Sequence, residues 1–117
     1  MNIKILDCTL RDGAHVNKGL FGLKEIRNII KNLVDAKIDI IEIGFLQDIV
    51  NNKDFSENTS FYLNFSDLKN IIDDKLLNKG CKFAMMIRVE DCDVSKIIKS
   101  KYVNIIRFAF YYENMKL

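Results

Sequence analysis

Apolar residues gather in four short continuous runs along this chain. The second run, residues 39–45, is rich in isoleucine and is apolar on both faces apart from Glu42. Such a composition is typical of a strand in a parallel sheet that is covered on both sides. The four strands that these runs predict span about residues 3–7, 39–45, 82–89 and 103–110.

Between these runs the apolar positions follow a helical spacing. In residues 23–36 they recur every three or four positions, with charged side chains on the opposite face. Residues 67–77 predict a second helix, which Ser66 is placed to cap and Gly80 to end. Residues 46–65 are polar with four aromatic side chains, and a connection of this length is usually a lid, a binding loop or a disordered segment.

A short helix near residues 93–99, with Asp93 as its cap, completes the pattern. Strands that alternate with helices predict an α/β fold with a parallel sheet and right-handed crossovers. The 117 residues suffice for one domain, and 49% hydrophobic with 29% charged residues is typical of a globular protein.

Charge and apolar patterning argue against several classes of protein. The net charge is +2 without a dense basic cluster, so no nucleic-acid partner is expected. No apolar run is long enough to span a membrane, and the N-terminal run is too short for a signal peptide. A cytoplasmic protein is therefore expected. Its three cysteines lack metal-type spacing and are expected to be reduced.

Residues 7–15 concentrate reactive side chains directly after the first strand. Arg11, Asp12 and His15 place a cation, a carboxylate and an imidazole within five residues. In α/β folds, ligands bind at the carboxyl ends of the strands. These side chains are therefore suited to chemistry on an oxyanion or at a metal. Cys8 lies in the same stretch, where a small buried strand residue is expected.

The run Thr9-Leu10-Arg11-Asp12-Gly13 resembles the signature of the metal-dependent aldolase and lyase superfamily. Members include 3-hydroxy-3-methylglutaryl-CoA lyase, isopropylmalate synthase and 4-hydroxy-2-oxovalerate aldolase. The additional match at His15 makes the motif most similar to that of the 4-hydroxy-2-oxovalerate aldolase branch. Residues 39–45 and 103–110 resemble the family's second and fourth strands. The resemblance implies that residues 1–117 are the N-terminal half of a (β/α)8 TIM barrel, with about four parallel strands and intervening helices.

The resemblance also implies roles for individual residues. Asp12 would bind a divalent cation, Mg²⁺ or Mn²⁺, which prefers carboxylate oxygen. Arg11 would face the enolate oxygen that forms when a carbon–carbon bond breaks, where a fixed guanidinium stabilises the new charge. His15 would act as the base that takes the substrate hydroxyl proton, since histidine moves protons near neutral pH. The family has a glutamate near its site at the position of Glu42.

Each of these residues has a structural alternative. Asp12 could cap the following turn, Arg11 could be a surface cation, and His15 could be solvated. Glu42, a carboxylate among isoleucines, must be paired or bind a metal, and a pairing with Arg11 or Arg88 would satisfy it.

Three further side chains are candidates for supporting roles. Arg88 and Arg107 lie late in the third and fourth strands, where they could bind a substrate carboxylate or form ion pairs inside the barrel. Asp7 is expected to support the motif arginine or to accept a backbone donor.

The resemblance further implies a site that this sequence does not complete. The family binds its metal with two more histidines from a later strand, and His15 is the only histidine here. A whole barrel needs ~250 residues. The expected function is a divalent-metal-dependent carbon–carbon lyase or aldolase for a small 2-oxo or hydroxy acid, incomplete in this chain. The alternatives are a non-catalytic half-barrel that serves as an interaction module or needs a partner chain, and an open α/β domain that holds an anion.

The outermost strands of such a half-barrel would have open apolar edges, which favour pairing with another chain. Self-association or a second half-barrel chain is therefore expected. The inner face of the sheet is expected to include Ile40, Met85 and Phe108.

Overall fold

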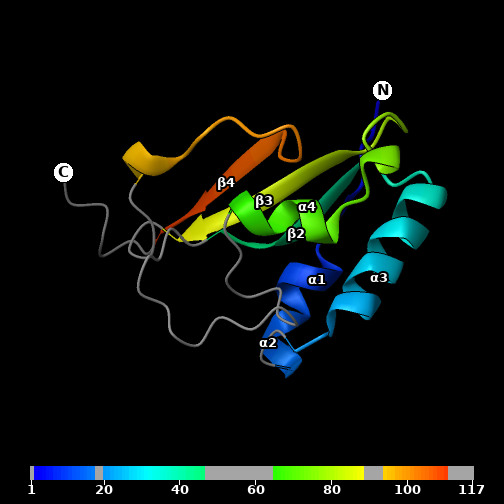
Figure 1. The fold of residues 1–117 in the computed structure, drawn as a ribbon, viewed down its shortest axis with the longest axis horizontal. Helices are drawn as coiled ribbons and strands as arrows, with labels where there is room; N and C mark the ends of the chain where they lie inside the picture. Colours follow the sequence, from blue (N-terminus) through cyan, green and yellow to red (C-terminus); the bar gives the residue numbers. More distant parts are fainter. Residues whose placement is uncertain (1, 18–19, 47–64, 89–93, 111–117) are drawn as a thin grey trace.

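The computed structural model describes residues 2–17, 20–46, 65–88 and 94–110 (Figure 1). One sheet of four parallel strands runs through them, in the order β1-β2-β3-β4. The strands are β1 (Leu6–Asp7), β2 (Ile40–Phe45), β3 (Lys82–Arg88) and β4 (Ile105–Ala109). The helical elements are α1 (Thr9–Asp12), α2 (Ala14–Asn17), α3 (Leu23–Asp35) and α4 (Leu68–Ile71), with 3₁₀ turns η1 (Phe65–Asp67), η2 (Asp74–Leu76) and η4 (Val94–Lys96).

The consecutive strand order distinguishes two kinds of α/β fold. A doubly wound sheet reverses its strand order at a switch point, whereas each strand of a TIM barrel lies beside the one that precedes it. Here every strand pairs in parallel with its predecessor in sequence. The predicted half-barrel arrangement of four parallel strands with intervening helices is thereby confirmed.

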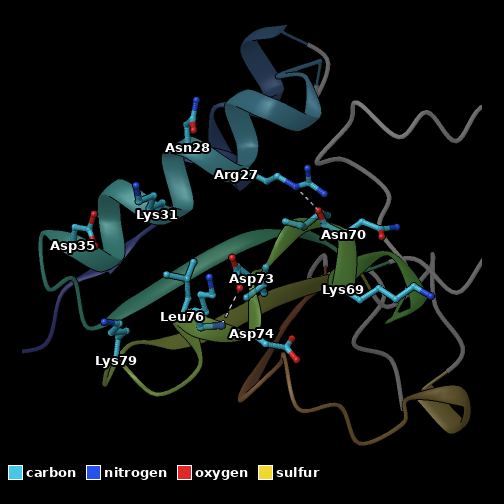
Figure 2. Close-up of a pocket in the computed structure, with 13 residues that line it drawn as sticks. Arg27, Asn28, Lys31, Asp35, Lys69, Asn70, Asp73, Asp74, Leu76 and Lys79 are labelled. Carbon is cyan, nitrogen blue, oxygen red and sulfur yellow. Dashed lines mark hydrogen bonds between the residues drawn. The ribbon is translucent and has the colours of Figure 1, made fainter.

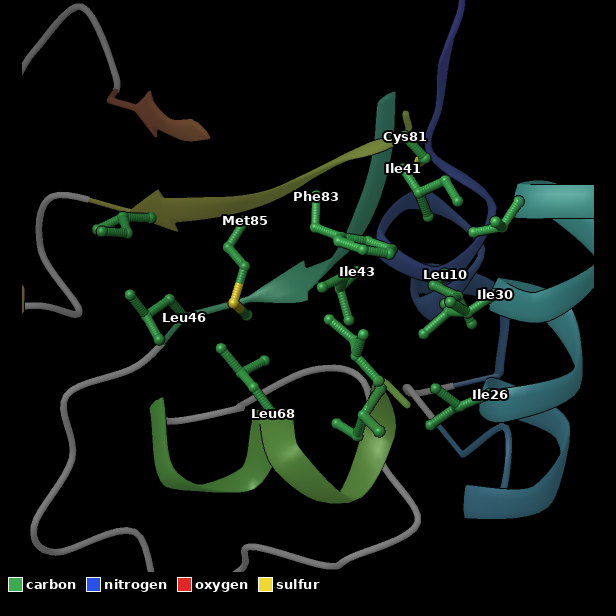
Figure 3. Packing of buried hydrophobic residues seen from close by; sticks show 14 residues of the cluster. Leu10, Ile26, Ile30, Ile41, Ile43, Leu46, Leu68, Cys81, Phe83 and Met85 are labelled. Atoms are coloured by element: carbon green, nitrogen blue, oxygen red, sulfur yellow. The ribbon is translucent and has the colours of Figure 1, made fainter. Parts of the chain in front are cut away.

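The core lies between one face of this sheet and the helices α3 and α4 (Figure 3). Helix α3 contributes Ile26, Ile30 and Val34, which recur at the spacing of one buried stripe. The strands contribute residues at alternate positions, because successive strand side chains point to opposite faces. Those from β2 and β3 are Ile41, Ile43, Phe83, Met85 and Ile87.

Helix α3 ends in a Schellman motif, within one residue of the predicted end. The amide of Ile38 donates to the carbonyl of Leu33 over 3.1 Å, and the amide of Lys37 donates to Val34 over 2.9 Å. Lys37 adopts the left-handed conformation that this motif requires, with φ of 60°. Ile38 and Leu33 both pack against the core, so the motif directs the chain into β2.

The second predicted helix, over residues 67–77, is wrong as a single element. It is divided into η1, α4 and η2, because Ile72 has an extended conformation. The Asp73 side chain accepts a hydrogen bond from the amide of Lys75 over 3.0 Å, and such local bonds compete with a continuing helix. The expected cap at Ser66 is also wrong, since Asp67 precedes α4. Gly80 has the expected positive φ, of 88°.

Strand β1 is shorter than predicted. Only Leu6 and Asp7 pair with β2 in regular register. The amide of Ile5 donates instead to the Asp39 side chain over 2.8 Å, so a carboxylate takes the place of a ladder carbonyl there. The third and fourth strands lie within their predicted ranges.

The expected inner face needs a correction. Met85 is fully buried in the core beneath the helices, and Phe108 pairs in register with Ile87 on that same face. The side chains of Ile40 and Ala84 belong to the opposite, inner face. Most of the long segment between the second strand and the next helix, residues 47–64, lies outside the described residues, as does the expected cap Asp93.

A core substitution tests this packing. Replacing Ile30, which is fully buried, with alanine should lower the free energy of unfolding by about 2–5 kcal/mol, because a cavity remains beside the sheet. The neighbouring exposed substitution Lys31→Ala should change it by less than about 0.5 kcal/mol. Urea unfolding followed by circular dichroism would measure both, and equal effects would contradict the assigned buried face.

Candidate active site

The candidate site occupies the inner face of the sheet, opposite α3. Glu42 in β2 aligns with Ala84 in β3, and Arg107 in β4 aligns with Met86. Parallel partners in register project to the same face, so Glu42 and Arg107 lie on one surface. Helix α1, which follows β1 directly, brings Arg11 to this surface.

Glu42 is fully buried and is bound by two arginines. The Nε of Arg11 donates to its Oε1, and the NH1 of Arg107 donates to its Oε2 over 2.7 Å. A buried carboxylate requires partners of this kind, and charge-assisted bonds to guanidinium groups are the strongest available. One of the two expected alternatives for Glu42, a pairing with Arg11, is what the structure contains. Its second partner is Arg107, for which the sequence had left open a substrate carboxylate or an ion pair inside the barrel.

The carboxylates of this network raise the pKa of Arg11. Burial acts to lower the pKa of Arg11, but the hydrogen bond and the negative charge of Glu42 outweigh it, with a smaller contribution from Asp12, and the pKa is raised overall. The guanidinium therefore remains a cation although only 14% of its side chain is exposed. The site thus has a permanent, oriented positive charge.

Asp12 lies beside Arg11 at the end of α1. Its Oδ1 accepts from Arg11 NH1 over 2.9 Å, and 66% of its side chain is exposed. The start of α1 is held by Asp7, which accepts from the amide of Thr9 over 2.9 Å and from its hydroxyl over 3.1 Å. Of the two roles expected for Asp7, this geometry corresponds to the backbone acceptor.

Gly13 follows α1 at a point where no side chain fits. A Cβ there would collide with the carbonyl oxygen of Thr9 and would approach the Phe21 ring to 3.1 Å. The Gly13 amide itself donates to that carbonyl over 2.9 Å. The close approach of backbone to backbone lets α2 begin immediately, and α2 carries His15.

Phe45, at the end of β2, contacts two of the predicted site residues. Its ring forms a T-shaped contact with the His15 ring, with centroids 5.8 Å apart. The Arg88 guanidinium lies over the same ring, with Cζ 5.4 Å from the centroid. Sequence reasoning missed Phe45. The available signal was Gly44, because a glycine inside a strand often marks an irregularity in pairing.

Cys8 also differs from expectation. It lies after β1 rather than within it, and it is half-buried. Its Sγ is 3.9 Å from the NH1 of Arg107. The thiol therefore borders the network of charged residues.

The described residues do not form a metal site by themselves. No group of three histidine, cysteine, aspartate or glutamate side chains among them could hold an ion. Both oxygens of Glu42 are occupied by arginines, and Asp12 supplies a single exposed carboxylate. Divalent cations such as Mg²⁺ need several oxygen ligands, so Asp12 alone is insufficient.

A separate cavity of about 820 Å³ lies between α3 and the segment from α4 to η2 (Figure 2). Its lining mixes basic and acidic side chains, and Arg27 donates across it to the carbonyl of Asn70 over 2.6 Å. At its border, hydrogen bonds from Tyr102 and Lys101 lower the pKa of Asp74. None of the predicted site residues lines this cavity, so we do not assign it to the site.

The consecutive parallel strands and the charged residues that follow the first strand agree with the barrel architecture that the motif implies. The chain belongs to the HMGL-like family, whose model matches residues 2–108. This family points in general to metal-dependent lyase or aldolase activity on small molecules, and its members typically use a divalent metal. No solved structure matches the chain significantly. In the described part of the chain, no helix is both long and apolar enough to cross a membrane.

A substitution at Glu42 tests the network. Glu42→Gln should lower the free energy of unfolding by about 3–5 kcal/mol, because both arginines would lose a buried negative partner. The matched control is Lys101→Gln, which removes the exposed ion pair with Asp74 and should leave stability nearly unchanged. Thermal or urea unfolding measures both, and a Glu42 variant as stable as the control would refute the assigned pairing.

Proposed function

We propose that this chain carries the enolate-stabilising part of a carbon–carbon lyase of the aldolase type, acting on a small 2-oxo or hydroxy acid. The observation that carries the proposal is the held position of Arg11. Its Nε and NH1 are bound by Glu42 and Asp12, so the guanidinium is oriented before any ligand binds. None of its hydrogen bonds to the described residues uses NH2, which leaves donors for a substrate oxygen.

These residues suit the cleavage of a hydroxy-oxo acid. His15 takes the proton of the substrate hydroxyl, and that oxygen becomes a carbonyl as the adjacent carbon–carbon bond breaks. The electron pair of the bond moves onto the 2-oxo group, whose oxygen becomes an enolate facing Arg11. A preorganised cation at that point lowers the barrier because it meets charge where it develops.

Two further arginines suit the substrate carboxylate. Arg107 is engaged only through NH1 among the described residues, and 39% of its side chain is exposed. Arg88 extends from the end of β3 over the Phe45 ring. A planar guanidinium binds carboxylates in a bidentate manner, so either residue suits this role. Glu42 then serves the site by fixing Arg11 and Arg107.

The family's divalent metal requires ligands beyond Asp12. In this proposal they come from outside the described residues, and a second copy or a second half-barrel chain remains a predicted source of them. The exposed apolar residues at the outermost strands support such a partner. Ile3 and Ile5 precede β1, and Phe108 and Phe110 lie at β4. The same surfaces favour the second candidate function, a non-catalytic interaction module.

Activity measurements separate the two functions. The purified chain with Mn²⁺ should release pyruvate from 4-hydroxy-2-oxovalerate, the substrate of the branch that its motif resembles. Arg11→Lys should lower turnover by about 10²–10³-fold, because the oriented donor is lost. Asp12→Asn should also lower it, whereas Arg27→Lys in the outer cavity should have no effect.

Retained turnover in the Arg11 variant would contradict the proposed role. A well-folded, self-associated wild-type chain that releases no pyruvate would contradict a second copy as the source of the missing ligands, and it would leave a different half-barrel chain or the interaction module. Light scattering of the same preparation identifies the assembly that was assayed.

A further inference from the structure

Phe45 is placed on the inner face by a break in strand pairing. Glu42 aligns with Ala84, so an unbroken register would align Gly44 with Met86. Phe45 aligns with Met86 instead, so the pairing shifts by one residue between Glu42 and Phe45. A one-residue shift reverses the faces to which side chains point. Leu46 consequently joins the core beneath the helices, whereas Phe45 is buried without belonging to that core cluster.

Two of the predicted site residues contact the Phe45 ring. His15 comes from α2, after the first strand, and Arg88 comes from the end of β3. Each meets the same ring, through a T-shaped contact and a cation–π contact respectively. Aromatic contacts of these kinds have preferred geometries, so one ring can orient both side chains.

The two contacts also limit the space between these groups. The His15 ring and the Arg88 guanidinium lie no farther apart than the sum of 5.8 Å and 5.4 Å, because both distances are measured to the Phe45 centroid. Phe45 therefore keeps the imidazole within a limited distance of the guanidinium.

We propose that Phe45 is a positioning residue that sets the spacing between His15, which faces the substrate hydroxyl, and Arg88, which suits the substrate carboxylate. This inference rests on the proposed function for its substrate class. The contacts of the ring are independent of that function. Phe45 does not itself react with the substrate but acts through the two side chains that it orients.

The single histidine makes this proposal directly measurable. In proton NMR, the Hδ2 and Hε1 resonances of His15 should be displaced by the ring current of Phe45. Phe45→Leu should move both resonances toward their values in an unstructured peptide, and Phe45→Tyr should retain the displacement. Phe65→Leu, which removes a ring packed elsewhere on the core, should leave them unchanged.

Binding measurements test the effect of this spacing on the substrate. The acid 4-hydroxy-2-oxovalerate would be titrated into the wild-type protein and the same variants, with the His15 resonances as the signal. Its affinity should fall by about 10-fold in Phe45→Leu and persist in Phe45→Tyr. Circular dichroism checks that each variant is folded.

The outcomes separate this inference from the proposed function. His15 resonances that do not move in a folded Phe45→Leu protein would overturn the positioning role, whatever the protein binds. An unchanged affinity in that variant would overturn the effect of the spacing on the substrate. A wild-type protein that does not bind this acid would contradict the proposed function, while the resonances would still decide whether Phe45 positions His15. If Phe45→Leu does not fold, Phe45→Tyr tests the positioning role instead. Loss of the His15 displacement in that folded variant would overturn the role.

Discussion

The burial of one carboxylate between two arginines is the constraint on which the site depends. Glu42 is fully buried in the second strand, and it is tolerated there only because Arg11 and Arg107 reach it from the first and fourth segments of the half-barrel. The same bonds fix the two guanidinium groups. One interaction therefore satisfies a requirement of the fold and orients the cations that the proposed chemistry uses.

A second constraint is the change of register in β2. Before the shift, Ile41 and Ile43 pack beneath the helices. After it, the side chain of Phe45 lies on the inner face. Irregular pairing of this kind often re-aims a side chain next to a functional site. Here the shift brings Phe45 of β2 into contact with His15, which follows β1, and with Arg88, which ends β3.

Much of the architecture follows from patterns that the sequence shows. The stripe in α3 and the continuous apolar strands depend on local spacing, and both are found at nearly the predicted positions. The interruption after α4 depends on a side-chain bond of Asp73, which periodicity does not reveal. At the site, the motif located Arg11, Asp12 and His15, and a buried charge at Glu42 required a partner.

The identity of that second partner needed three-dimensional information. Arg107 is 65 residues from Glu42 in sequence, and only the consecutive strand order brings it close. Likewise, the face to which Phe45 and Met85 point depends on register, which alternation alone does not give when a strand is apolar on both sides.

The most direct test of this account is a double-mutant cycle between Glu42 and Arg107. The free energies of unfolding of Glu42→Gln, Arg107→Met and the double variant would be compared with that of the wild-type chain. The account predicts a coupling of about 1–3 kcal/mol, because the half-exposed Arg107 pairs with the buried carboxylate of Glu42. Effects that add to within about 0.5 kcal/mol would mean that the two residues do not interact, which would contradict the account.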